Sequence, residues 1–223
     1  VIAGNIEPQK TLVLCEKYFG RIQSGYTPDN KLEKEPEQLS LRELSVEREV
    51  PADAIMMAYH VPHRLSPDYH KADLLSDIMA NGKSSRFYSK LVKEKQIFSD
   101  IDAFIYGSID PGLLIIRGFP AKGIKLDKAE KEISAIVTGI KENSPDNNEL
   151  TKVKNKAISA WMFSNISVEN KAFHLAFFEM LGNVGLINDE DNAYSSVKTE
   201  DFSRFAKNRL TSNNCSVLKY YAK

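Results

Sequence analysis

The spacing of hydrophobic residues predicts several β-strands. Apolar and polar residues alternate in 42–50 (RELSVEREV), which is typical of a half-exposed strand, whereas 54–62 (AIMMAYHVP) is apolar enough for a buried central strand. Alternation returns from residue 97, with Ile101, Ala103 and Ile105 on one face, and the run LLIIRGF (113–119) fits an antiparallel return strand. A further strand is predicted in CSVLKYY (215–221).

Elsewhere the apolar residues recur every three or four positions, which predicts helices. The first covers 8–19, and the second follows Ser66-Pro67-Asp68, which offers an N-cap, a first-turn proline and a first-turn acid, and it ends at Asn81-Gly82. Ser84 or Ser85 caps a third, amphipathic helix, whose lysines form a solvated face. Three more helices follow residue 125, and Thr199 is predicted as the cap of another.

The order of these elements predicts an α+β fold. Hairpins stand beside a separate group of helices, as in two-layer folds with a mainly antiparallel sheet and helices packed on one face. Residues 23–41 are polar and contain two prolines, so we expect a surface connection there, and we interpret 1–223 as a single domain. The opening VIAGNIEP lacks an initiator Met and begins with a strand-like tripeptide, which suggests a cut through a longer protein.

Composition excludes some classes of protein. The chain has 42% hydrophobic and 27% charged residues, as globular proteins do, and its 30 basic and 30 acidic residues balance without a sustained basic tract. We therefore expect a soluble protein that neither binds nucleic acid nor spans a membrane, and composition does not choose between cytoplasm and periplasm. The two cysteines, Cys15 and Cys215, are interpreted as separate thiols, although a disulfide between them is possible.

Residues that could carry chemistry are sparse. His60 and His63 lack the i, i+4 spacing of a helical zinc pair, and His70 and His174 are interpreted as a surface and a packed residue. Asp100 and Asp102 resemble a carboxylate pair, but on a strand they are more simply solvent-facing neighbours. The chain has no Gly-x-Ser-x-Gly, phosphate-loop or dinucleotide motif, so on its residues alone it contains no catalytic or metal site.

The chain resembles the pitrilysin/insulinase family of zinc metallopeptidases, which includes the mitochondrial processing peptidase. Four stretches carry the resemblance in order and spacing: VIAGNIEP, EKYFGRI, the run from Tyr59 to Gln96, and DPG (110–112). Its most specific part is the family motif, whose residues we interpret as structural: Gly82, Ser84, Ser85, Arg86 and Tyr88.

The resemblance implies the C-terminal, non-catalytic half of such a peptidase. One half of these proteins carries a His-x-x-Glu-His zinc motif, which this chain lacks, and Asn5 stands where the family usually has Asp. In many non-catalytic halves an Arg and a Tyr contact substrate, and Val92 and Ser99 occupy the matching positions. Both lack the polar groups of that pair, so we interpret the stretch 84–99 as structural and keep Lys93, Ser99 and Val92 as the candidates for a substrate-chamber contact.

The implied function is to form a wall of a peptide-binding chamber. A homologous catalytic half, in the same chain or a separate subunit, would supply zinc, the metal-bound water and the general base, so the parent protein would be a zinc metalloendopeptidase while this part is not catalytic. The alternative is a structural or interaction subunit of the same fold without a peptidase partner. A His-x-x-Glu-His motif upstream of Val1 would distinguish the two.

Overall fold

The computed structural model describes residues 1–26, 33, 35–107 and 109–223. The chain divides into two compact units. Unit 1 comprises Val1–Glu37 and Met162–Ile187, and unit 2 comprises Gln38–Trp161 and Asn188–Lys223. Part of the predicted surface connection 23–41 lies outside the described residues, and its described part contains no helix or strand. The single domain expected from the sequence stays a prediction.

Most elements occupy the residues that the pattern predicts. The elements are α1 (Pro8–Phe19), β1 (Arg42–Arg48), β2 (Ala54–Val61), α2 (Tyr69–Ala80), the π-helix η1 (Tyr88–Glu94), β3 (Phe98–Tyr106), β4 (Gly112–Pro120), α3 (Leu126–Glu142), α4 (Asn147–Ser164), α5 (Val168–Met180), the 3-10 helix η2 (Val184–Asn188), α6 (Glu190–Ser196), α7 (Thr199–Arg209), the 3-10 helix η3 (Ser212–Asn214) and β5 (Cys215–Ala222).

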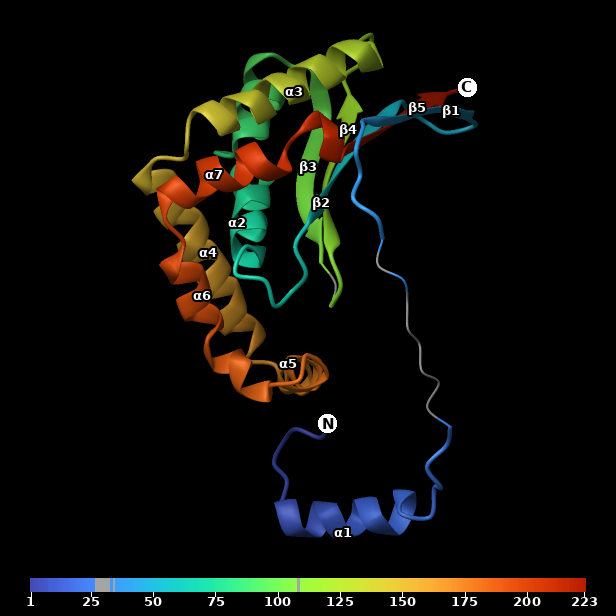
Figure 1. Ribbon diagram of the computed structural model, residues 1–223, viewed down its shortest axis with the longest axis vertical. Helices are drawn as coiled ribbons and strands as arrows, with labels where there is room; N and C mark the ends of the chain where they lie inside the picture. The colour runs from blue at the N-terminus through green and yellow to red at the C-terminus, as the bar shows by residue number, and fades with distance from the viewer. Residues whose placement is uncertain (27–32, 34, 108) are drawn as a thin grey trace. The chain divides into compact units, whose positions relative to one another are not determined.

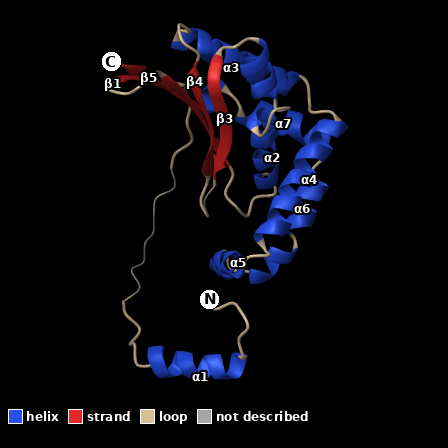
Figure 2. Cartoon of the chain, turned by 180° about the vertical axis from the view of Figure 1, so that it is seen from behind, coloured by secondary structure: helices blue, strands red, loops and turns tan. Residues whose placement is uncertain are grey.

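Unit 2 is built on a five-stranded sheet in the order β1-β5-β2-β4-β3 (Figure 2). The pairs β2–β4, β2–β5 and β3–β4 are antiparallel, and β1 pairs with β5 in parallel. The mainly antiparallel sheet of the sequence prediction is therefore confirmed. The strand predicted to be central and buried, β2, has neighbours on both sides and contributes Ile55 and Tyr59 to the core.

Helices α2, α3 and α7 cover one face of this sheet (Figure 1). The period-two pattern of the strands directs alternate side chains to that face, where Leu114 and Ile116 are fully buried. The apolar faces of the helices pack on the same core, which confirms the predicted α+β class with helices on one face of the sheet. The largest fully buried helix side chains there are Leu74, Leu75, Ile78, Met79, Leu126 and Phe202.

The opposite face of the sheet carries no helix of unit 2 in the described part of the chain (Figures 1 and 2). Register places Met56, Arg117 and Asp102 side by side on this face, with Phe104 beside Ile115 in the next row. Met56 and Phe104 are exposed. We call this surface the open face.

Four local predictions are wrong. Val1–Ala3 form no strand, and no strand pairs with them among the described residues, so their apolar pattern was misleading. Asp68 rather than Ser66 is the N-cap of α2, and Lys198 rather than Thr199 is that of α7. The third predicted helix is a π-helix over most of its length, and Gln96, two residues after its last residue Glu94, has a positive φ of 51°.

A buried polar cluster joins α2 to α6, a short helix that the pattern did not predict. Glu190 is 5% exposed and binds the Arg64 guanidinium, while its second oxygen lies 3.4 Å from His70 Nε2. Tyr194 Oη donates a 2.6 Å hydrogen bond to Asp73 Oδ2. Burial raises the pKa of Asp73, and burial of Glu190 is outweighed by its bonds to His70 and Arg64, which lower its pKa.

We expect Glu190→Ala to destabilise the protein by about 3–5 kcal/mol, because it leaves the Arg64 guanidinium buried without its carboxylate. The matched control Glu200→Ala removes an exposed carboxylate from α7 and should cost less than about 1 kcal/mol. Denaturant unfolding of both variants measures the difference. Equal unfolding free energies for the two variants would contradict a structural role for the cluster.

The contacts of Glu190 with Arg64 and His70 also predict that the stability of the protein depends on pH. Since the pKa of Glu190 is lower in the folded state, its stabilisation is complete above the unfolded-state value of about 4.3 and decreases as the pH falls below it. Glu190→Ala should therefore lose less stability than the parent chain between about pH 5 and pH 3.

Candidate functional site

The family motif forms the turn between α2 and η1. Gly82 has a φ of +93°, a conformation that side chains with a Cβ rarely adopt, so a glycine suits this position after α2. Ser85 is 2% exposed, and its hydroxyl accepts a 3.4 Å hydrogen bond from the Tyr88 N–H at the start of η1. Of the two serines predicted as caps, Ser85 therefore makes the capping contact.

Arg86 joins this turn to α4. Its Nε and Nη2 atoms donate to the two carboxylate oxygens of Glu149 at 3.0 and 2.8 Å, and Nη1 donates to the Asn143 carbonyl at 3.2 Å. Ser84 accepts a 2.6 Å hydrogen bond from Lys152 of α4. A two-point Arg–carboxylate contact fixes both distance and orientation, so this geometry supports the structural interpretation of the motif.

The three substrate-chamber candidates lie on two elements. Val92 is half-buried and packs against the hydrophobic core from η1, and Lys93 is exposed beside it. Ser99 is exposed on β3, the edge strand, and its hydroxyl donates a 2.9 Å hydrogen bond to the Phe119 carbonyl. No hydrogen bond or ion pair joins these three side chains, all of which lie in the described part of the chain, and their role in binding substrate stays a prediction.

The histidines and acids that could have formed a metal site are dispersed in the described part of the chain. His60 Nδ1 lies 3.2 Å from Asn214 Oδ1, and His174 Nδ1 lies 3.0 Å from Asn165 Oδ1. The interpretation of His70 as a surface residue is wrong, because it is buried against Glu190 in the polar cluster. Asp102 is bound by Arg117 at 2.6 Å on the open face. Within the described ranges, no three His, Cys, Asp or Glu side chains converge on a position for a metal ion.

Both cysteines are free thiols, as the separate-thiol interpretation expects. Cys215 is buried in β5, where burial raises the pKa of its thiol. Among the described residues, no helix is long and apolar enough to cross a membrane.

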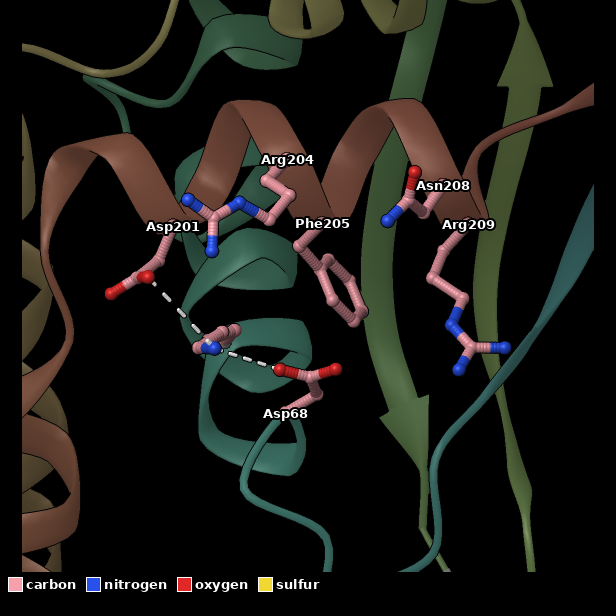
Figure 3. A pocket seen from close by; sticks show the side chains of 7 residues that line it. Asp68, Asp201, Arg204, Phe205, Asn208 and Arg209 are labelled. Atoms are coloured by element: carbon pink, nitrogen blue, oxygen red, sulfur yellow. Dashed lines mark hydrogen bonds and ion pairs between the residues drawn. The ribbon is translucent and has the colours of Figure 1, made fainter.

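A pocket that the sequence did not reveal lies between the start of α2 and α7 (Figure 3). Its volume is about 280 Å³. The spacing of Asp201, Phe205 and Asn208 along one helix face was visible in the sequence, but only packing shows that α2 completes the wall. The lining residues are Asp68, Lys71, Asp201, Arg204, Phe205, Asn208 and Arg209.

Comparisons with known proteins identify a matching family model and similar structures. A family model described as the peptidase M16 inactive domain matches residues 1–157. The zinc protease PqqE of Helicobacter pylori is 24% identical over 209 residues, covering 92% of this chain and 47% of that protein. The crystal structure of a protease from Helicobacter pylori superposes with a TM-score of 0.90 at 22% identity, covering 98% of this chain and 54% of that one.

A second similar structure is that of a shorter chain. It is the inactive peptidase domain of a candidate zinc protease from Bordetella parapertussis, with a TM-score of 0.72 at 24% identity. The match covers 80% of this chain and 95% of that domain. By contrast, this chain spans about half the length of the two Helicobacter pylori proteins.

We expect Val92→Ala to cost about 1–2 kcal/mol of unfolding free energy, because it removes apolar surface that packs on the core. Ser99→Ala should change the stability by less than about 1 kcal/mol, since its hydroxyl makes one exposed hydrogen bond. Lys93→Ala, an exposed neighbour, is the matched control and should stay within about 0.5 kcal/mol. Urea denaturation measures all three, and a loss for Lys93→Ala equal to that for Val92→Ala would contradict the packing role.

We also expect the chain to bind no stoichiometric zinc, since no three His, Cys, Asp or Glu side chains converge among the residues that the structure describes. Elemental analysis after dialysis against zinc-containing and then zinc-free buffer measures this. One tightly held zinc per chain would show that the prediction is wrong.

Proposed function

Because the chain belongs to the family of peptidase M16 inactive domains, we propose that it forms a non-catalytic wall of the substrate chamber in a zinc peptidase. The observation that carries this proposal is the match over residues 1–157 in a chain without a His-x-x-Glu-His motif. A homologous catalytic half would hold the zinc, which polarises the scissile carbonyl and activates water. The residues of this chain would then restrict which peptides reach that site.

Unit 1 supports the proposed pairing through its exposed apolar side chains. Helix α1 contains no buried residue, and Leu12, Val13 and Phe19 are each more than 60% exposed. Met162 and Phe173 in the second segment of unit 1 are similarly exposed. Apolar surface of this kind marks a protein interface, so we assign unit 1 as a surface that packs on the catalytic half.

The open face of unit 2 supports pairing in the same way. Its residues include Met56, Phe104 and Leu44, all exposed, around the ion pair of Asp102 and Arg117. A sheet face of this composition is stabilised when an apolar element covers it. The share of the relatives' length that lies outside this chain is about half, which is enough for a second domain to supply that element.

The proposal has three further parts. The substrates are peptides, the compartment is the bacterial cytoplasm or periplasm, and the residues that line the chamber include Lys93, Ser99 and Val92. Lys93 and Ser99 are exposed and could contact a peptide backbone, whereas the partly buried Val92 would act by positioning η1. The alternative function is a purely structural subunit. This alternative predicts the same exposed apolar surfaces on unit 1 and on the open face, but a parent gene without a His-x-x-Glu-His motif.

The pairing proposal predicts that the chain alone self-associates through α1, because the partner that would cover its apolar residues is absent. Sedimentation velocity over a range of concentrations should show reversible association, and Leu12→Glu should abolish it at an unchanged melting temperature. Lys10→Glu changes the charge of an exposed residue on the same helix and is the control.

A pull-down with the polypeptide encoded upstream of Val1 completes the test. We expect capture by the parent chain and by Lys10→Glu, and weak capture by Leu12→Glu. A strictly monomeric chain that captures nothing would overturn the pairing, and an upstream sequence without His-x-x-Glu-His would favour the structural subunit.

A further inference from the structure

The pocket between α2 and α7 has an uneven distribution of charge. Lys71 Nζ binds Asp68 Oδ1 at 2.7 Å and lies 3.9 Å from Asp201 Oδ1. Asp201 also accepts a 2.9 Å hydrogen bond from the backbone N–H of Lys198. Both acids and the lysine are therefore compensated within the protein.

The two arginines of the pocket are not compensated. Neither the Arg204 nor the Arg209 guanidinium has a hydrogen-bond or ion-pair partner among the described residues, although both line the pocket and are exposed. An arginine presents a planar array of donors that matches a carboxylate or phosphate group. The uncompensated donors of the pocket therefore favour anions.

The arginines lie at two ends of the pocket rather than together. In Figure 3, Arg204 lies on the side of Asp201, Arg209 lies on the other side, and the Phe205 ring is between them. Five residues of α-helix separate their Cα atoms by about 7.5 Å along the axis. Phe205 is only 4% exposed, so the middle of the pocket has a fixed apolar wall.

From this arrangement we propose that the pocket binds a ligand with two anionic groups separated by a short apolar spacer. One oxyanion would contact Arg204 and the other Arg209, and the spacer would lie along Phe205, close to the compensated Lys71. Asn208, which also lines the pocket, offers an amide donor to either group. A short dicarboxylate and a peptide with two acidic side chains share this chemistry. The proposal is independent of the proposed peptidase role.

An NMR titration of the ¹⁵N-labelled chain at constant ionic strength tests it, with the α7 amides and the arginine Nε–H signals as probes. Adipate supplies two carboxylates and acetate one. We expect adipate to saturate the α7 signals with at least about tenfold higher affinity than acetate, because the second contact forms within the same complex. The blocked peptide Glu-Ala-Glu distinguishes an acidic segment from a small dicarboxylate, according to which of the two binds more tightly.

Arg204→Gln and Arg209→Gln should each reduce the affinity for the two-anion probe about tenfold, to that of acetate. Both side chains are exposed and unpaired, so these variants should keep the melting temperature of the parent chain. Lys207→Gln is the matched control, because it removes a charge from an exposed position of α7 outside the pocket, and it should leave the affinity unchanged.

Four results would overturn the proposal. The first is that neither two-anion probe binds saturably, and the second is that adipate, the peptide and acetate bind with equal affinity. The third is that Lys207→Gln changes the affinity as much as the two pocket variants do, and the fourth is that neither arginine variant changes the affinity.

Discussion

Burial of one face of the sheet under α2, α3 and α7 is the constraint on which the rest of unit 2 depends. A strand with one buried face must alternate apolar and polar residues, and a helix that covers it must carry a single apolar stripe. Residues such as Ile55 and Ile116 satisfy the first condition, and Leu75 and Phe202 satisfy the second. Because all three helices lie on the same side, no helix covers the opposite face in the part of unit 2 that the structure describes, and Met56 and Phe104 stay exposed there.

Polar contacts then determine how the helices outside this core are attached. The Arg86–Glu149 pair orients the start of α4 against the turn after α2, and Glu190 holds α6 through Arg64 and His70. Of the two contacts, the Glu190 cluster lies close to Asn188, where the second segment of unit 2 begins. The hydrophobic core thus sets the layers, while a few partly buried ion pairs hold the start of α4 and the helix α6 in place.

The fold was predictable from the sequence where local pattern and tertiary burial agree. The bounds of α1 match the prediction, and β2, β4 and β5 lie where apolar runs predict them. The N-cap of α2 moved two residues because Ser66 accepts a bond from Asp68 N–H instead of opening the helix. Helix α6 was missed because its stability comes from Glu190, whose partners lie more than a hundred residues away, and single-sequence periodicity carries no such information.

The candidate site was less predictable than the fold. The pocket could not be inferred, because Lys71 and Arg204 are adjacent only through the packing of α2 on α7. Ionic residues on helix surfaces are usually solvated, so their pattern does not distinguish a pocket wall from an ordinary exposed face.

The position of β5 between β1 and β2 has a consequence for synthesis on the ribosome. Strands β2, β3 and β4 follow one another in the chain, and β4 pairs antiparallel with both of the others. These three strands can assemble as soon as α2 and α3 emerge to cover them. Strand β1 cannot join them, because its only neighbour in the sheet is β5, which is translated after all the helices. During that interval one edge of β2 presents unpaired peptide groups, as edge strands do. A nascent chain that paired β2, β4 and β3 before β5 is made would present this open edge until β5 adds to it.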